Sequence, residues 1–159
     1  MIIGNGDIAK IINDRADALF FISGVSNSLC EDENEFQREI DLLLSQRRDL
    51  CLVYISTISQ YYYESAYVNH KRQMEDVIKN NFENYLIIRI GNIDFGTNPN
   101  TFLNFMRKRK AENKVLTIRD EYRYMVSKEQ ILLVTDYFPM HGKNEICIFG
   151  HMKKIKDLI

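Results

Sequence analysis

Short, nearly continuous apolar runs alternate with stretches of helical periodicity, and this alternation constrains the fold more than any other feature of the chain. The apolar runs cover residues 18–24, 50–55, 85–90 and 146–149, with a very short one at 1–3. Helical spacing of apolar residues marks the intervening segments 36–44, 67–78, 102–106 and 127–134. Strands that are buried on both faces are apolar throughout, and strands that alternate with helices form a parallel sheet. We therefore expect an α/β fold with a mostly parallel sheet.

Weaker patterns predict a few further details of the secondary structure. Isoleucines at helical spacing predict a short helix over residues 8–12, and the capping-box pattern Ser127-Lys128-Glu129-Gln130 predicts where the helix at 127–134 begins. A short strand is expected over 115–118 and a terminal helix over 153–159.

Composition bounds the class of protein. The 159 residues suffice for one domain, 1–159, and 45% hydrophobic with 27% charged residues is ordinary for a soluble globular protein. The net charge of −1 argues against binding to nucleic acid or to an anionic membrane. The chain has three widely spaced cysteines, Cys30, Cys51 and Cys147. An odd number without a close pair suits reduced thiols in a cytoplasmic protein. The histidines lack metal-ligand spacing, no apolar run approaches membrane-spanning length, and the N-terminus lacks a signal-peptide layout.

A glycine pattern follows the first apolar run directly. The stretch Gly4-Asn5-Gly6-Asp7-Ile8-Ala9 reads G-x-G-x-x-A, the alanine-ended form of the dinucleotide fingerprint. Its glycines allow a tight turn and a close approach of the backbone to a pyrophosphate at a helix N-terminus. A plain turn from strand to helix also favours glycine, and the pattern alone does not separate the two interpretations.

A second pattern follows the run at 50–55. Tyr67 and Lys71 are four residues apart, which places them one above the other on one face of a helix. A nearby ammonium favours the phenolate, so Lys71 is expected to lower the pKa of Tyr67 and make it a general acid or base. The hydroxyl of Thr57, at the strand end, could hold a substrate oxygen beside it. The competing interpretation is a surface pair on an amphipathic helix.

Taken in order, these motifs resemble a known family. The glycine fingerprint is followed by Ile22-Ser23-Gly24, by the strand at 52–57, by Tyr67-x-x-x-Lys71 and by Ile90-Gly91-Asn92-Ile93. This order resembles the extended short-chain dehydrogenase/reductases, the NAD-dependent epimerase/dehydratase group that acts on nucleotide sugars. The resemblance implies a Rossmann-like three-layer domain with NAD or NADP as cofactor and a nucleotide sugar as substrate.

The resemblance also implies roles for individual residues. Tyr67 would be the catalytic acid or base, Lys71 would lower its pKa and bind the nicotinamide ribose, and Thr57 would bind the reacting oxygen. Asn92 would lie near the nucleotide sugar, and Arg123 would contact a phosphate, with Arg119 as a competing alignment. The residues that would lie against the cofactor are Gly4, Asn5, Gly6, Asp7, Ile8, Ser23 and Gly24.

The chain also departs from the family pattern. Only residues 13–17 separate the first helical pattern from the next strand, where the family carries further strands and helices that hold the adenosine half of the cofactor. Asp14 and Asp17 lie too close to the glycines to be the acidic residue expected about 20 positions later. The segment between Thr57 and Tyr67 is short, and the family's helix asparagine cannot be placed within 35–44.

These departures predict a truncated fold. The sheet should have four or five strands, lack part of the adenosine-binding half and expose its first strand at an edge. An exposed edge favours self-association, so we expect a homo-oligomer.

Two kinds of function remain open. The first is an NAD(P)-dependent oxidoreductase or epimerase with a Thr-Tyr-Lys site. The second is a non-catalytic or nucleotide-binding relative in which Tyr67 and Thr57 are ordinary buried polar groups. The basic run 107–110 could contact phosphates of nucleic acid, but the near-neutral charge supports this poorly.

Overall fold

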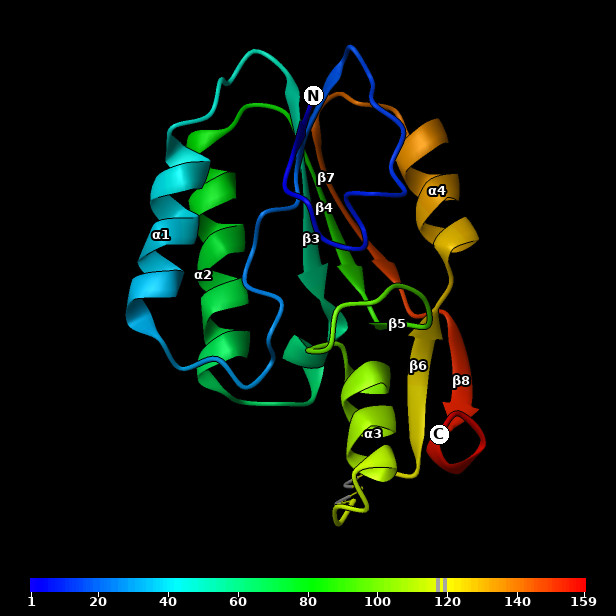
Figure 1. Cartoon of the computed structure of the whole chain (residues 1–159). Helices are drawn as coiled ribbons and strands as arrows, with labels where there is room; N and C mark the ends of the chain where they lie inside the picture. Colours follow the sequence, from blue (N-terminus) through cyan, green and yellow to red (C-terminus); the bar gives the residue numbers. More distant parts are fainter. Residues whose placement is uncertain (117, 119) are drawn as a thin grey trace.

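Five parallel strands form the main sheet (Figure 1). The computed structural model of the chain describes residues 1–116, 118 and 120–159. The strand order is β1-β2-β3-β4-β7, and every neighbouring pair is parallel, as predicted. These strands are β1 Ile2–Ile3, β2 Ala18–Phe21, β3 Cys51–Thr57, β4 Tyr85–Ile90 and β7 Lys143–Ile148.

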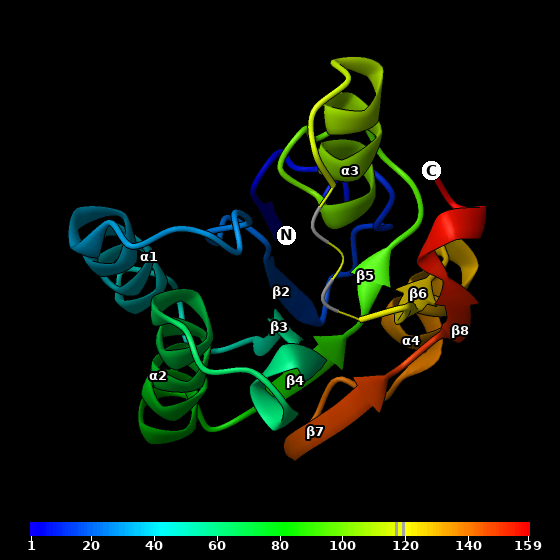
Figure 2. The same cartoon turned by 90° about the horizontal axis from the view of Figure 1, so that it is seen from below.

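Helices α1 (Glu33–Leu44) and α2 (Ala66–Asn81) cover one face of this sheet (Figures 1 and 2). Successive strand residues point to opposite faces. Leu19 and Phe21 therefore pack with Leu52 and Tyr54 against the apolar sides of these helices. Burial of this apolar surface, worth about 25 cal/mol per Å², is the main term that holds the two layers together.

The opposite face is covered by α4 (Lys128–Tyr137) and by the turn that follows β1. Phe20 and Val53 pack here with Ile12 and Ile131. Helix α4 begins with the predicted capping box, since the Ser127 hydroxyl accepts from the Gln130 amide and the Gln130 side chain accepts from the Ser127 amide. The predicted three-layer α/β arrangement is therefore confirmed.

A second, small sheet lies beyond the carboxyl ends of the main strands and was not predicted. Its order is β5-β6-β8, with β6 antiparallel to β8, and α3 packs beside it (Figure 2). Its members are β5 Asn92–Ile93, β6 Tyr122–Val126 and β8 His151–Lys154, and α3 is Phe102–Ala111. The predicted terminal helix over 153–159 is wrong: β8 occupies its start, and a 3₁₀ turn, Ile155–Asp157, follows. The strand expected over 115–118 lies partly outside the described residues; Val115 and Leu116 are not in a strand.

The helix predicted over residues 8–12 is also wrong. The segment after the glycines forms hydrogen-bonded turns, in which Lys10 N–H donates to the Gly6 carbonyl and Ile11 N–H to the Ile8 carbonyl. Between the end of β1 and Ala18 the chain returns to the amino end of β2, and residues 4–17 do so through turns and irregular backbone without a helix.

Strand β1 forms one edge of the main sheet, as predicted. In the usual doubly wound dinucleotide fold the first strand lies inside the sheet, with two further strands on its outer side. Those two strands have no counterpart in the described part of this chain. Self-association through this edge stays a prediction. No helix among the described residues is long and apolar enough to cross a membrane.

Candidate functional site

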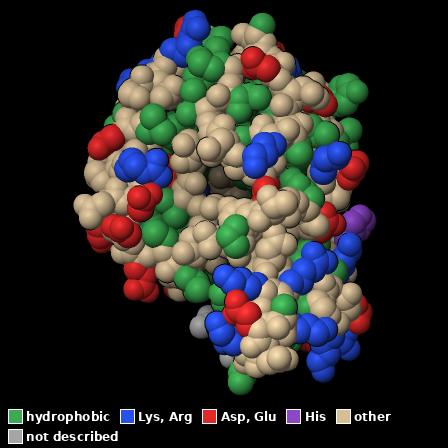
Figure 3. Space-filling model, in the orientation of Figure 1, with side chains coloured by type: hydrophobic (Ala, Val, Ile, Leu, Met, Phe, Trp, Pro, Cys, Tyr) green, Lys and Arg blue, Asp and Glu red, His purple; other side chains and the backbone are tan. Residues whose placement is uncertain are grey.

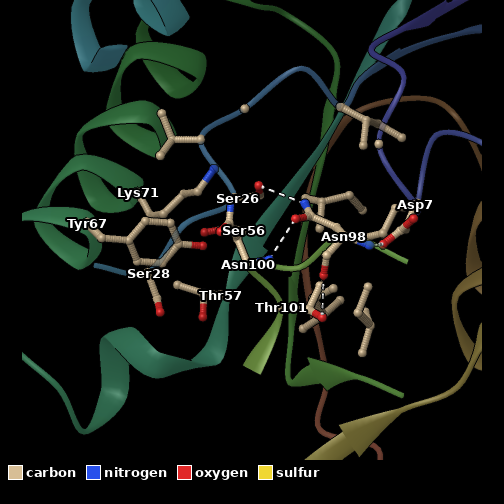
Figure 4. A pocket seen from close by; sticks show the side chains of 18 of the residues that line it. Asp7, Ser26, Ser28, Ser56, Thr57, Tyr67, Lys71, Asn98, Asn100 and Thr101 are labelled. Carbon is tan, nitrogen blue, oxygen red and sulfur yellow. Dashed lines mark hydrogen bonds between the residues drawn. The ribbon is translucent and has the colours of Figure 1, made fainter. Parts of the chain in front are cut away.

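A cavity of about 490 Å³ lies at the carboxyl ends of β1 to β4. The crevice outside the carboxyl ends of the strands is where open α/β sheets bind ligands. Figure 3 shows the hollow opening on the molecular surface above α3. Figure 4 shows two groups of polar side chains in it: Tyr67, Thr57 and Ser28 lie on one side, and Asp7 and Asn98 lie on the other.

Most of the residues singled out in the sequence line this cavity, and two do not. Gly4 and Arg123 lie outside the lining, and Arg119 is outside the described residues. The residues that line it are Asn5, Gly6, Asp7, Ile8, Ser23, Gly24, Thr57, Tyr67, Lys71 and Asn92. The cavity thus brings together residues from Asn5 to Phe102, which are far apart in the sequence.

Thr57 stands where β3 ends and a 3₁₀ turn, Ile58–Tyr61, begins. Its hydroxyl oxygen caps this turn by accepting from the Ser59 amide at 3.1 Å. Because that contact uses only a lone pair, the hydroxyl proton remains available to donate. Thr57 is therefore held in place and keeps a donor for a ligand oxygen.

Tyr67 lies in the first turn of α2, which Ser65 caps by accepting from the Val68 amide. Although the ring keeps some exposure to the cavity, burial raises the pKa of Tyr67. The charge of Lys71 acts in the opposite sense but does not reverse the shift, and Glu39 adds to it. The predicted lowering of this pKa is therefore wrong in its net direction, because burial outweighs the charge of Lys71.

Lys71 is buried and donates two hydrogen bonds. Its Nζ is 2.8 Å from the Tyr54 hydroxyl and 3.3 Å from Glu39 Oε1. The ammonium also lies 5.7 Å from the centre of the Tyr67 ring. The lysine therefore lines the cavity while its charge is balanced by Glu39 behind the cavity wall.

Glu39 itself is fully buried and accepts from four donors. Besides Lys71, the donors are the Tyr54 hydroxyl at 2.9 Å, the Val25 amide at 2.8 Å and His70 Nε2 at 2.8 Å. Burial alone would raise the pKa of this carboxyl, but Lys71, His70 and Val25 together lower it to about 2. Glu39 is therefore an anion near neutral pH.

Sequence reasoning missed Glu39, Tyr54 and His70, although a signal existed. Glu39 lies on the apolar side of α1, beside Ile40 and Leu43. An acid at such a position needs buried donors, because an unpaired buried charge is very costly. The neighbours His70 and Lys71, on the buried side of α2, are the matching signal.

The fingerprint glycines differ sharply from one another. A Cβ added at Gly4, where φ is +129°, would lie 2.3 Å from the backbone oxygen of Ile22. A Cβ at Gly6 would meet no heavy atom within 4 Å. Gly4 therefore allows close packing of β1 on β2, whereas Gly6 leaves an open surface in the cavity. Gly24 has a third role, since a Cβ there would lie 2.5 Å from Glu39 Oε1.

Asp7 contacts a loop that is distant in sequence. Its Oδ2 accepts from the backbone amide of Asn98 at 2.8 Å, and the side-chain amide of Asn98 donates to the Ser26 hydroxyl at 3.2 Å (Figure 4). Gly96 permits the approach, because a Cβ there would lie 2.3 Å from the Asp7 carboxylate. The loop between β5 and α3 is thereby fastened over the turn after β1.

Arg123 makes aromatic and ionic contacts within the chain, and its predicted phosphate contact stays a prediction. Its guanidinium lies 5.3 Å from the centre of the Tyr63 ring and 4.9 Å from the centre of the Phe102 ring. Its Nη2 is 3.2 Å from Asp120 Oδ2. These contacts connect β6 to α3 and to the segment before α2, so the side chain stabilises the small sheet beside the cavity.

Solved structures with a similar fold include two UDP-sugar 4-epimerases and an enzyme bound to NAD. UDP-glucuronic acid 4-epimerase from Bacillus cereus, in complex with UDP-glucuronic acid and NAD, aligns with a TM-score of 0.60 and 20% identity over 96% of this chain and 60% of that one. UDP-glucose 4-epimerase from Thermotoga maritima, with UDP-glucose, aligns with a TM-score of 0.63 and 14% identity over 89% and 58%. The Bordetella bronchiseptica enzyme WbmG, in complex with NAD, aligns with a TM-score of 0.64 and 11% identity over 89% and 53%.

The predicted resemblance to the extended short-chain dehydrogenase/reductases is confirmed for the fold. The chain spans less than two thirds of the length of these structures. No protein-family model matches the sequence, and no curated protein matches it either. The activity must therefore be argued from the cavity itself.

Proposed function

We propose that the cavity binds a nicotinamide cofactor together with a nucleotide sugar, and that Tyr67 exchanges a proton with a sugar oxygen. One observation carries this proposal: Thr57, Tyr67 and Lys71 line the same cavity as the open surface at Gly6. The bound nicotinamide would supply or accept a hydride. The chain belongs, on this proposal, with NAD(P)-dependent oxidoreductases and epimerases.

The residues fit one half of such a cofactor. The bare surface at Gly6 leaves room for a pyrophosphate, with Ser23 and Gly24 beside it. For the adenosine half the fit is poor, because β1 is an edge strand. Asp14 and Asp17, the acids nearest the glycines after Asp7, already pair with the N-terminal ammonium and with Arg15.

The other side chains of the cavity would bind the substrate and transfer the proton. The free proton of the Thr57 hydroxyl would hold the reacting oxygen, and the adjacent Tyr67 hydroxyl would donate or accept the proton. Lys71 has a third N–H that is not used by Tyr54 or Glu39, and it would bind a ligand hydroxyl at the cavity wall. Asn92 would contribute its amide to the sugar side.

A second candidate function is a non-catalytic binding protein of the same fold. The observation in its favour is the raised pKa of Tyr67, which is due first to burial and also to Glu39, while the charge of Lys71 does not reverse it. In this case the cavity would bind a nucleotide or sugar without chemistry.

Calorimetric titration with NADH and NADPH, alone and with UDP-glucose, separates the candidates. The enzyme proposal expects micromolar binding of one cofactor, which Gly6→Val weakens strongly and Gly6→Ala weakens less, because the larger side chain fills more of the open surface. Tyr67→Phe should keep cofactor binding and abolish turnover. Binding of UDP-glucose without either cofactor would favour the second candidate, and unchanged cofactor affinity in folded Gly6→Val would contradict the assignment of the glycine turn.

A further inference from the structure

The carboxylate of Glu39 joins four separate segments behind the cavity wall. It stands on α1 and accepts from Tyr54 on β3, from His70 and Lys71 on α2, and from the Val25 amide after β2. The side chains of Glu39 and His70 are at most 1% exposed. So complete a set of donors around one buried carboxylate fixes the position of each donor.

Lys71 is the donor whose position matters for the cavity. Its Nζ lies against the Tyr54 hydroxyl at 2.8 Å and Glu39 Oε1 at 3.3 Å, so two of its three N–H groups point away from the cavity. The Tyr67 ring centre is 5.7 Å away. The side chains that fix Lys71 are therefore those of Glu39 and Tyr54.

Two opposite charges act on the Tyr67 hydroxyl. Lys71 favours its phenolate, and Glu39 disfavours it, while burial also favours the neutral form. Moving Lys71 towards Tyr67, or removing the charge of Glu39, would shift this balance towards the phenolate. Glu39 therefore influences Tyr67 both through the position of Lys71 and through its own charge.

We propose that Glu39 is a positioning residue: it holds the Lys71 ammonium on Tyr54, and its own charge opposes the effect of that ammonium at Tyr67. This role does not depend on the function proposed above, because it concerns the protein without ligand.

The test measures the pKa of Tyr67 in Glu39→Gln. The readout is the NMR signal of tyrosines labelled with ¹³C at Cζ, and the signal of Tyr67 is identified by its absence in Tyr67→Phe. The matched control is Asp41→Asn, which makes the same change on an exposed position of the same helix. We expect the pKa of Tyr67 to fall by about one unit in Glu39→Gln, and to stay at the wild-type value in Asp41→Asn. A Tyr67 pKa that is unchanged or higher in folded Glu39→Gln overturns the proposal.

A second measurement uses the unaltered protein and is decisive if Glu39→Gln does not fold. The proposal expects the Lys71 ammonium protons, observed by ¹⁵N NMR and assigned with Lys71→Arg, to exchange with water much more slowly than those of exposed lysines. Exchange at the rate of a surface lysine overturns it. If the cofactor titration fails while the Tyr67 shift is observed, the proposed function is wrong and the role of Glu39 stands.

Discussion

The two sides of the cavity are built in different ways. On one side, which we call the lysine wall, Thr57 stands on β3, Tyr67 and Lys71 stand on α2, and Lys71 pairs with Glu39. On the other side, the glycine wall, the turn at residues 5–8 is covered by the loop at 96–101. The first consists of regular elements around a buried ion pair, and the second consists of turns and loops. On the function proposed above, proton transfer would depend on the lysine wall, and cofactor affinity would depend on the glycine wall.

This difference predicts where changes affect stability and where they affect binding. A regular wall with buried charges should lose much stability when one charge is removed, because the partners remain buried and unpaired. A wall of exposed turns should tolerate change with small effects on stability, since few buried contacts depend on it.

The largest expected effect is a loss of unfolding free energy at low pH. Glu39 has its pKa lowered from 4.5 to about 2, so its ionised form stabilises the fold above pH 4.5, and this contribution is lost as the pH falls through about 2. At about 1.4 kcal/mol for each pH unit, the lost contribution is about 3 kcal/mol. Urea unfolding of the wild type between pH 7 and pH 2 measures it.

The control for this prediction removes the titrating group. Glu39→Gln combined with Lys71→Met removes both partners and avoids an unpaired buried charge. This double variant should show a flatter dependence of its unfolding free energy on pH than the wild type. An equal dependence in both proteins would mean that Glu39 is not the group that stabilises the lysine wall.

A smaller effect separates the two fingerprint glycines. Gly4→Ala forces a side chain into a positive φ and onto the Ile22 carbonyl, and such strain costs about 1–3 kcal/mol. Gly6→Ala places the same methyl group in open space and should change the free energy of unfolding by less than about 0.5 kcal/mol. Thermal and urea unfolding of both variants compare the two positions directly. Equal losses would remove the distinction between a packing glycine and a cavity glycine.

The sequence predicted the lysine wall better than it predicted the surroundings of that wall. Apolar runs identify strands that are buried on both faces, and helical spacing places Tyr67 and Lys71 together on α2. The partner of Lys71 could not be found in the same way, because Glu39 lies 32 positions earlier on another helix. A local pattern contains no information on which buried donors will meet a given acid.

The glycine wall and the small sheet were predicted less well, for a related reason. Asp7 meets Asn98 across 91 positions, and no local spacing indicates such a contact. Strands β6 and β8 are partly exposed and carry polar residues, such as Arg123 and Lys153, so they lack the apolar runs of buried strands. The helix expected after Gly6 is replaced by hydrogen-bonded turns, a difference that the spacing of three isoleucines does not reveal.

The smallest expected effect concerns the loop that covers the glycine wall. Asp7→Ala removes the acceptor of the Asn98 amide and should cost about 1 kcal/mol, the usual net value of one hydrogen bond. Asp7→Asn is the matched control, because its side-chain oxygen can still accept. Hydrogen exchange at the Asn98 amide should accelerate in Asp7→Ala and stay near the wild-type rate in Asp7→Asn; equal exchange in all three proteins would show that Asp7 does not fasten the loop.

The same pair of variants also tests what the loop does for binding. If NADH affinity falls in Asp7→Ala and is kept in Asp7→Asn, the fastened loop at 96–101 is part of the cofactor site and takes over some of the role of the missing adenosine side. If the affinity rises, the loop competes with the cofactor for the surface at Gly6. Either result assigns the glycine wall a role in affinity, whereas an unchanged affinity in both variants would leave cofactor binding to the lysine wall alone.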